Sequence, residues 1–262
     1  MQEKTERVLN RRKMSLFLDE LVASGEIINS LYIPAGADLP DAVSLSADIG
    51  AAISKSETGV AVFLGRSRAI LVLPPFPIKE KYLSPGCQVE PLRSLLTRDY
   101  NIALVLVRLG AYAIGVCEGE RLVASKVGTG LIHAHHKKGG SSQQRYGLHR
   151  EKQIESFVTR ICGHIREKIG PRARELDYVV YGGSRQALLA LKKGCPFLEK
   201  LEGWELPALL DIPDPKQEVL EKTVGRVWST RVIEYSYPTP SGRTLQGEPL
   251  VEIVRHLTNR IK

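Results

Sequence analysis

Residues 101–127 read NIALVLVRLGAYAIGVCEGERLVASKV, and this stretch decides the fold of the second half of the chain. Predominantly apolar runs cover residues 101–108, 111–117 and 121–127. Gly110 separates the first two runs, and residues 118–120 separate the last two. Apolar runs joined by such short turns pair with their neighbours in sequence. The stretch therefore predicts an antiparallel meander of three strands.

The chain after the meander continues with a strand extension and a long helix. Residues 131–135 extend the predicted sheet. The apolar positions of the helix recur every three or four residues: Ile154, Phe157, Val158, Ile161, Cys162, Ile165 and Ile169. Gly170-Pro171 ends it. Residues 177–181 then predict a buried strand, and Ser184 is placed to cap a helix over residues 185–193.

The first 98 residues predict a small α/β domain of their own. Helical spacing of apolar residues predicts a helix over residues 5–24. The segments that follow are a strand at 30–33, a helix at 47–54, a hairpin at 60–64 and 69–73, and a helix at 91–96.

The alternation of strands and helices predicts an α/β (α+β) fold, with a mixed sheet flanked by helices in the second domain. A helix at 215–230 and a strand at 232–237 complete that domain, and residues 248–261 form a terminal helix. We place the domains at residues 1–98, 99–238 and 239–262.

Composition indicates a folded protein with a polyanionic partner. The chain has 262 residues, of which 43% are hydrophobic and 25% charged, and a formal net charge of +8. A charged N-terminus and the lack of an 18-residue apolar run predict a cytoplasmic protein with no membrane partner. Cysteines without a Cys-x-x-Cys pair are expected to be reduced packing residues: Cys87, Cys117, Cys162 and Cys195.

Basic charge gathers in residues 137–152, whose local net charge of +4 is half that of the chain. The charged residues there are Lys137, Lys138, Arg145, Arg150 and Lys152 against Glu151, and the histidines in or beside this stretch are His133, His135, His136 and His149. Such a cluster predicts contacts with RNA phosphates.

The same stretch contains two glycines and two glutamines. Gly139 and Gly140 let the backbone come close to a ligand. Gln143 and Gln144 carry neutral amides, which can orient a water molecule without adding charge beside phosphates. Gly-Gly-Ser-Ser is also typical of a flexible connector. The basic flanks and the long helix that follows favour a functional loop.

Residues 136–146, HKKGGSSQQRY, resemble the catalytic loop of the release-factor-like domain of the Vms family. That family comprises peptidyl-tRNA hydrolases of ribosome quality control, related to the catalytic domain of eukaryotic and archaeal class-I release factors. The resemblance is specific at the loop, agrees in element order over residues 99–238 and is weaker over residues 1–98. It indicates a compact prokaryotic member.

The resemblance implies that a Gly-x-x-Gln element enters the peptidyl-transferase centre and promotes attack of water on the ester. Gly140-x-x-Gln143 matches this spacing, so Gln143 is the implied catalytic residue, with Gly139 and Gly140 shaping the loop. Gln144 is the alternative, because the inserted serines shift the register from the Gly-Gly-Gln of termination factors. Contacts to rRNA or acceptor-stem phosphates are implied for Lys137, Lys138, Arg145, Arg150 and His136.

The expected function is codon-independent hydrolysis of peptidyl-tRNA on stalled ribosomes or large subunits, with no metal, nucleotide or other cofactor. The expected partners are the large ribosomal subunit, its rRNA and peptidyl-tRNA. Residues 1–98 lack the Asn-Ile-Lys-Ser codon-reading element, so stop-codon-directed termination is not expected.

Two other functions stay open: cleavage of the tRNA 3′ end, and ribosome or RNA binding without catalysis. A metal site at His133, His135 and His136 lacks a spaced carboxylate or cysteine to complete it. The serines lack the Gly-x-Ser-x-Gly elbow of a hydrolase triad. Residues 182–185, Gly-Gly-Ser-Arg, are interpreted as a strand-to-helix turn in preference to a phosphate-binding loop.

Overall fold

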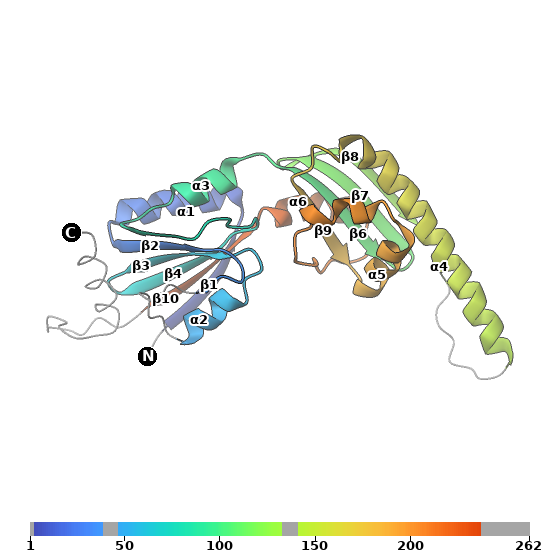
Figure 1. The fold of residues 1–262 in the computed structure, drawn as a ribbon, viewed down its shortest axis with the longest axis horizontal. Coiled ribbons are helices and arrows are strands. Elements are labelled where there is room, and N and C mark those ends of the chain that lie inside the picture. Colours follow the sequence, from blue (N-terminus) through green and yellow to red (C-terminus); the bar gives the residue numbers. More distant parts are fainter. Residues whose placement is uncertain (1–2, 39–46, 133–140, 237–262) are drawn as a thin grey trace. The chain divides into compact units, whose positions relative to one another are not determined.

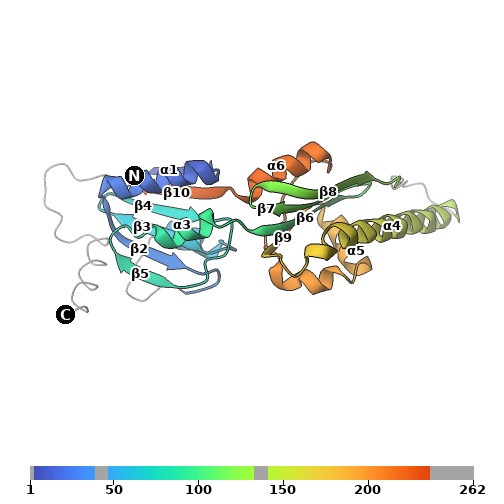
Figure 2. The same ribbon diagram turned by 90° about the horizontal axis from the view of Figure 1, so that it is seen from above.

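The computed structural model describes residues 3–38, 47–132 and 141–236, without the side chains of Glu3, Ala47 and residues 141–147. The chain divides into two compact units. One runs to Thr97 and includes the stretch from Trp228 onward, and the other is Arg98–Val227. Figures 1 and 2 show that each unit contains one sheet with helices packed on it. The expected α/β fold class is confirmed.

The sheet of the first unit has six strands in the order β1-β10-β4-β3-β2-β5, and all neighbouring pairs are antiparallel. The strands are β1 (Glu3–Leu9), β2 (Ile27–Ile33), β3 (Val60–Gly65), β4 (Arg68–Leu73), β5 (Tyr82–Pro85) and β10 (Thr230–Ser236). β3 and β4 form the hairpin expected from the sequence.

Helices pack on both faces of this sheet. They are α1 (Arg11–Ser24), α2 (Ala47–Ser54) and α3 (Glu90–Thr97). Side chains from α1 and α3 share a buried core with Phe63 and Val72. Ile49 and Ile53 of α2 pack with Leu71 on the opposite face. Alternate residues of the strands therefore serve two separate cores.

The helix expected over residues 5–24 is wrong at its start, because residues 3–9 form strand β1. Asn10 ends the strand and caps α1, accepting a hydrogen bond from the Lys13 backbone N–H at 2.9 Å. β1 pairs with β10, which lies at the far end of the described chain. Helical spacing could not indicate that pairing, since it depends on residues distant in sequence.

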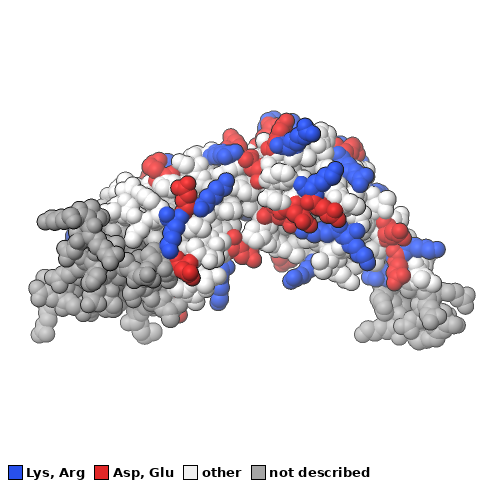
Figure 3. Space-filling view, viewed as in Figure 1, with Lys and Arg blue, Asp and Glu red and all other residues white. Residues whose placement is uncertain are grey.

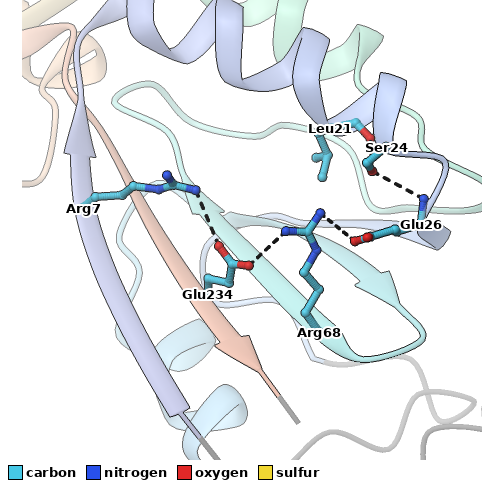
Figure 4. A network of polar contacts seen from close by, with 6 residues as sticks. All are labelled: Arg7, Leu21, Ser24, Glu26, Arg68 and Glu234. Atoms are coloured by element: carbon cyan, nitrogen blue, oxygen red, sulfur yellow. Dashed lines mark hydrogen bonds and ion pairs between the residues drawn. The ribbon is translucent and has the colours of Figure 1, made fainter. Parts of the chain in front are cut away.

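An ion-pair network crosses the three strands at this edge of the sheet, as Figure 4 shows. The Glu234 carboxylate lies 3.5 Å from the Arg7 guanidinium and 3.1 Å from that of Arg68. Arg68 also pairs with Glu26 at 2.7 Å. Partly exposed pairs of this kind each contribute little. The Val8 side chain of β1 is also 65% exposed and adds little burial. Backbone pairing with β10 is therefore the main attachment of β1.

Strand β10 belongs to the first unit, which corrects the expectation that residues 232–237 complete the second domain. It lies between β1 and β4. Val232 enters the core beneath α1 and α3, and Ile233 enters the core beneath α2. The second unit therefore ends at Val227 and not at residue 238, while the helix expected at 248–261 lies outside the described residues.

The second unit contains a four-stranded mixed sheet in the order β8-β7-β6-β9. Its strands are β6 (Asn101–Arg108), β7 (Ala111–Glu118), β8 (Arg121–Thr129) and β9 (Tyr178–Gly183). β6, β7 and β8 form the expected antiparallel meander, and β9 joins β6 in parallel.

The helices of the second unit lie on both faces of that sheet. They are α4 (Ser141–Lys168), α5 (Arg185–Gly194) and α6 (Gln217–Val227), with short 3-10 helices η1 (Gly170–Arg172) and η2 (Leu198–Trp204). α4 and α5 share a core with Val105 and Ile114. Leu220 of α6 lies over Gly115 on the other face. Ser184 caps α5 as expected, accepting from the Ala187 backbone N–H.

The expectation that all four cysteines are reduced is wrong for two of them. Cys162 of α4 and Cys195 at the end of α5 form a disulfide, with their Cα atoms 5.3 Å apart. The two helices pack side by side, and this brings together residues that are 33 positions apart in sequence. Cys87 and Cys117 are free thiols.

Candidate functional site

The first half of α4 extends away from the core of the second unit. Ile154 is the first described apolar residue of α4 to pack on that core, and Phe157 is the first that is fully buried. Leu148, six residues before Ile154, is 60% exposed. At 1.5 Å per residue, Gln143 lies about 21 Å along the helix from Phe157. Figure 1 shows this end of α4 beyond the edge of the sheet.

The predicted catalytic glutamines lie at the start of α4 and not in a loop. The loop expected over residues 136–146 is wrong in its second part, because residues 141–146 are helical. No glycine or proline follows Gly140 to interrupt the helix until Gly147, and glutamine and arginine are good helix formers. The structure does not describe the side chains of Gln143, Gln144 and Arg145. The other predicted site residues lie wholly outside the described residues: His136, Lys137, Lys138, Gly139 and Gly140.

Arg150 is the one predicted phosphate-binding residue whose side chain is described, and it is partly exposed. Lys152 beside it is exposed. His149 and Gln153 contact each other one turn apart, with their Nε2 atoms separated by 3.3 Å. Figure 3 shows basic and acidic side chains interspersed on the face that it draws. The described part of the candidate site therefore carries two cations, Arg150 and Lys152, together with the exposed anion Glu151.

The segment before the candidate site leaves the sheet at a defined place. β8 ends at Thr129, and the Gly130 backbone N–H donates to the Gly110 carbonyl at 2.9 Å. Leu131 points to solvent, whereas Ile132 packs against the core. Residues 131 and 132 do not extend β8 as expected, and 133–135 lie outside the described residues. The chain thus leaves the core at Ile132, and its next described contact with that core is at Ile154.

An aromatic cluster that the sequence did not indicate lies beneath this exit. Tyr112 of β7 packs edge-on against Phe157 of α4, with ring centroids 5.8 Å apart, and stacks on His164 at 5.9 Å. The Arg160 guanidinium lies 6.0 Å from the Phe157 ring. Burial raises the pKa of the Tyr112 hydroxyl, opposed by the charge of Arg160. The alternation of side chains along β7 places Tyr112 on the sheet face that α4 covers. This alternation is the one sequence signal from which the cluster could have been predicted.

The turn at Gly182 and Gly183 uses its backbone groups within the chain. The Gly183 N–H donates to the Leu210 carbonyl at 2.8 Å, and the Ser184 N–H donates to the Val107 carbonyl at 2.9 Å. Gly183 has a positive φ of 107° and lies against the backbone of Val107. This arrangement confirms a strand-to-helix turn, in which those two donors are not available to a phosphate.

The part of the chain that the structure describes offers neither a metal site nor a membrane-spanning helix. No three His, Cys, Asp or Glu residues there are grouped so that they could hold a metal ion. His133, His135 and His136 are outside that part. Among its helices, none is both long enough and apolar enough to cross a membrane.

Comparison with known proteins relates the second unit to translation factors. Residues 100–233 match the family described as Actinobacteria/chloroflexi VLRF1 release factor. Peptide chain release factor subunit 1 of Archaeoglobus fulgidus is 23% identical over 109 residues, which are 42% of this chain and 27% of that protein. The chain therefore matches less than a third of the length of this curated relative.

Two solved structures are similar to the chain at low sequence identity. The archaeal translation termination factor aRF1 has a TM-score of 0.40 and 16% identity, with 97% of this chain and 75% of that chain covered. Dom34 of S. cerevisiae, a translation termination-like factor, has a TM-score of 0.33 and 9% identity, with 86% and 66% covered.

Proposed function

The chain belongs to the Actinobacteria/chloroflexi VLRF1 release factor family, and we propose that it hydrolyses the ester bond of peptidyl-tRNA on stalled ribosomes or large subunits without reading a codon. The family match confirms the resemblance to release-factor-like proteins, which residues 136–146 and the order of the elements had indicated. The matched residues include the whole projecting half of α4.

The projecting helix is the observation that carries the proposal. An ester inside a ribosome can be reached only by a narrow element, because rRNA excludes a globular body. The start of α4 is a single helix that carries Gln143 about 21 Å beyond Phe157, the first buried side chain of the helix. The proposal therefore assigns contact with the ester to this end and leaves the sheet of the second unit outside.

Gln143 supplies the chemistry in this proposal. Its amide oxygen accepts a hydrogen bond from the attacking water, and its amide nitrogen donates to an oxygen of the reacting ester. A positioned donor of this kind stabilises the negative charge that develops on the ester in the transition state. Gly139 and Gly140 allow the backbone to approach the tRNA end closely. Gln144 takes this role if the register differs by one residue.

Basic residues around the glutamines hold the element against RNA. Lys137, Lys138, Arg145, Arg150 and His136 contact phosphates of rRNA or of the tRNA acceptor stem in this proposal. The partly exposed side chain of Arg150 on the projecting helix supports the assignment. Phosphate contacts position a protein on RNA without reading sequence. A factor that acts without a codon requires contacts of this kind.

The product of the reaction tests the proposal. Purified protein is added to stalled ribosome–nascent-chain complexes, and the released material is separated on a gel. We expect free peptide and intact tRNA. Peptide carrying tRNA nucleotides would instead establish cleavage of the tRNA 3′ end. Stable binding without any release would establish a ribosome-binding module.

A further inference from the structure

Strand β1 leaves one edge of the six-stranded sheet open. β1 is an end strand of that sheet, and β10 pairs with its inner side. Among the residues that the structure describes, no strand pairs with its outer side. The side chains of residues 4–8 are all exposed. An edge of this kind presents backbone N–H and C=O groups to which another strand can add.

The charged side chains of β1 are divided between the two faces of the sheet. Arg7 lies on the face that α1 covers. Lys4 and Glu6 lie on the opposite face, where the Lys4 ammonium is 5.9 Å from the centroid of the Tyr235 ring. That face therefore carries two opposite charges, one on each side of Thr5 along the strand.

Pairing of β1 with the β1 of a second copy has a restricted geometry. A two-fold axis perpendicular to the sheet makes the two strands antiparallel and keeps both α1 helices on the same face. Paired residues must then lie on the same face, so the axis passes through one residue, which meets its own copy. Residues at equal distances before and after that residue meet each other.

The charges of β1 favour one register. With the axis at Thr5, each Lys4 lies opposite Glu6 of the second copy, which gives two favourable cross-strand pairs. Positions 3 and 7, glutamate and arginine, meet in the same register and are also opposite in charge. With the axis at Lys4, Glu6 or Arg7, two like charges meet and destabilise the pairing. An axis nearer either end leaves too little of this seven-residue strand to pair.

Contacts within the chain do not bury these charges. The Glu6 carboxylate lies 3.6 Å from the Arg231 guanidinium, and 42% of the Glu6 side chain stays exposed. Arg7 reaches Glu234 at 3.5 Å, as Figure 4 shows, and half of its side chain is exposed. Both residues can therefore take a second partner across the edge.

We propose that two copies of this protein associate through their β1 strands, in the register centred on Thr5, and join their six-stranded sheets into one. The partner is a second copy because the charge pattern of β1 is complementary to itself. Only residues 3–7 of each strand pair, so the interface is smaller than the roughly 1,600 Å² of a standard one. The dimer is accordingly weak and forms at high protein concentration. This inference does not depend on the proposed function.

Reversal of single charges tests the register. Analytical ultracentrifugation of the full chain over a concentration series gives the Kd of the dimer, at low ionic strength because salt screens exposed charges. Lys4→Glu places glutamate opposite Glu6 at two positions, and Glu6→Lys places lysine opposite Lys4. We expect each variant to raise the Kd by about 10-fold or more. Arg12→Glu, on the exposed side of α1, changes the net charge as Lys4→Glu does and should dimerise like the wild type.

Mixing the two variants separates the register from loss of folding. Lys4→Glu and Glu6→Lys each repel their own copies, but one of each places lysine opposite glutamate at both positions. An equimolar mixture should therefore associate more tightly than either variant alone, and the double variant Lys4→Glu/Glu6→Lys should regain self-association. Thermal unfolding of every variant shows which of them are folded.

A cysteine at the axis locates the contact. Thr5→Cys in a Cys87→Ser background places two thiols opposite each other, so mild oxidation should link the two copies. The remaining free thiol, Cys117, is buried. Val8→Cys is the control, because its two copies would lie six residues apart along the strands, about 20 Å.

Three outcomes would overturn the inference and leave the proposed function intact. The first is a wild-type protein that stays monomeric at every concentration. The second is a dimer that Lys4→Glu and Glu6→Lys do not weaken, or that mixing them does not restore. The third is oxidation that links Val8→Cys and not Thr5→Cys, because the contact would then lie elsewhere.

Discussion

In the proposed function, the glutamines of residues 136–150 carry the chemistry and the cations hold the segment against RNA. A neutral amide is suited to a site rich in cations. The cations bind the phosphates, and the amide adds no negative charge that would repel those phosphates. Gln143 and Gln144 are embedded in such a stretch, with Lys137 and Lys138 before them and Arg145 directly after. Substituting the amides and substituting the cations should therefore impair different steps.

Neutralising the cations is expected to weaken ribosome binding and to flatten its salt dependence. Each true phosphate contact adds about 0.9 to the slope of log affinity against log salt on duplex DNA, and about 0.7 on single strands. Replacing Lys137, Lys138, Arg145 and Arg150 together by glutamine should lower this slope with little change in thermal stability. The measurement is binding across a salt series. An unchanged slope would mean that these side chains do not contact RNA.

At the scale of elements, α4 does two things: its second half covers the sheet and its first half reaches outward. Inserting seven alanine-rich residues between Leu148 and Ile154 should lengthen the projection by about 10 Å and keep its face nearly unchanged. We expect release to be lost while thermal stability is kept, because the insertion precedes the first core contact. Release at the wild-type rate would show that the distance between Gln143 and the core of the second unit does not affect hydrolysis.

The disulfide between α4 and α5 is expected to stabilise the second unit. The disulfide closes a loop of 33 residues and so lowers the conformational entropy of the unfolded chain. This raises the free energy of unfolding by about 3–4 kcal/mol. Cys195→Ser, or reduction of the wild-type protein, should lower the midpoint of thermal unfolding. Cys87→Ser is the control, because Cys87 is a free thiol in the first unit. Equal midpoints with and without reductant would contradict a stabilising disulfide.

Elements built from nearby residues could be predicted from the sequence, and those built from distant residues could not. The meander, the second half of α4 and the Ser184 cap depend on contacts within a few positions or on one periodic pattern. β1 and the placement of β10 depend on each other across the whole described chain. The disulfide and the edge-on contact of Tyr112 with Phe157 arise only when elements pack. The resemblance carried by residues 136–146 identified the candidate glutamines, while packing alone revealed the aromatic cluster of Tyr112, Phe157 and His164.

At the scale of the whole molecule, one arginine of the first unit contacts the ends of both of its covalent connections to the second. The Arg11 Nε donates to the Leu96 carbonyl at 2.7 Å, and a terminal nitrogen donates to the Thr97 carbonyl. The same guanidinium lies 4.3 Å from the ring of Trp228. Thr97 is the last residue before one connection, and Trp228 is the first after the other. Arg11 therefore holds the chain at Thr97 and at Trp228, where the two connections join the first unit.

Arg11→Ala should loosen both connections. The end of α3 would lose two hydrogen bonds from a charged donor, each contributing about 1.5–3 kcal/mol. Trypsin should then cut after Arg98 faster than in the wild-type protein, which sequencing of the fragment beginning at Asp99 would detect. Trp228 fluorescence should change as well, measured in a Trp204→Phe background. Arg12→Ala is the control, and equal cutting in both variants would argue against this role of Arg11.

The proposed role of Gln143 in hydrolysing the ester can be tested by single-turnover release with glutamine variants. Gln153→Ala is the control, because Gln153 lies on the same helix and contacts His149. We expect Gln143→Ala to bind ribosomes normally and to release peptide about 100- to 1,000-fold more slowly, as for the loss of one positioned donor. Gln153→Ala should release at the wild-type rate. A loss in Gln144→Ala alone would move the register by one residue. Wild-type release by both Gln143→Ala and Gln144→Ala would mean that neither glutamine promotes hydrolysis.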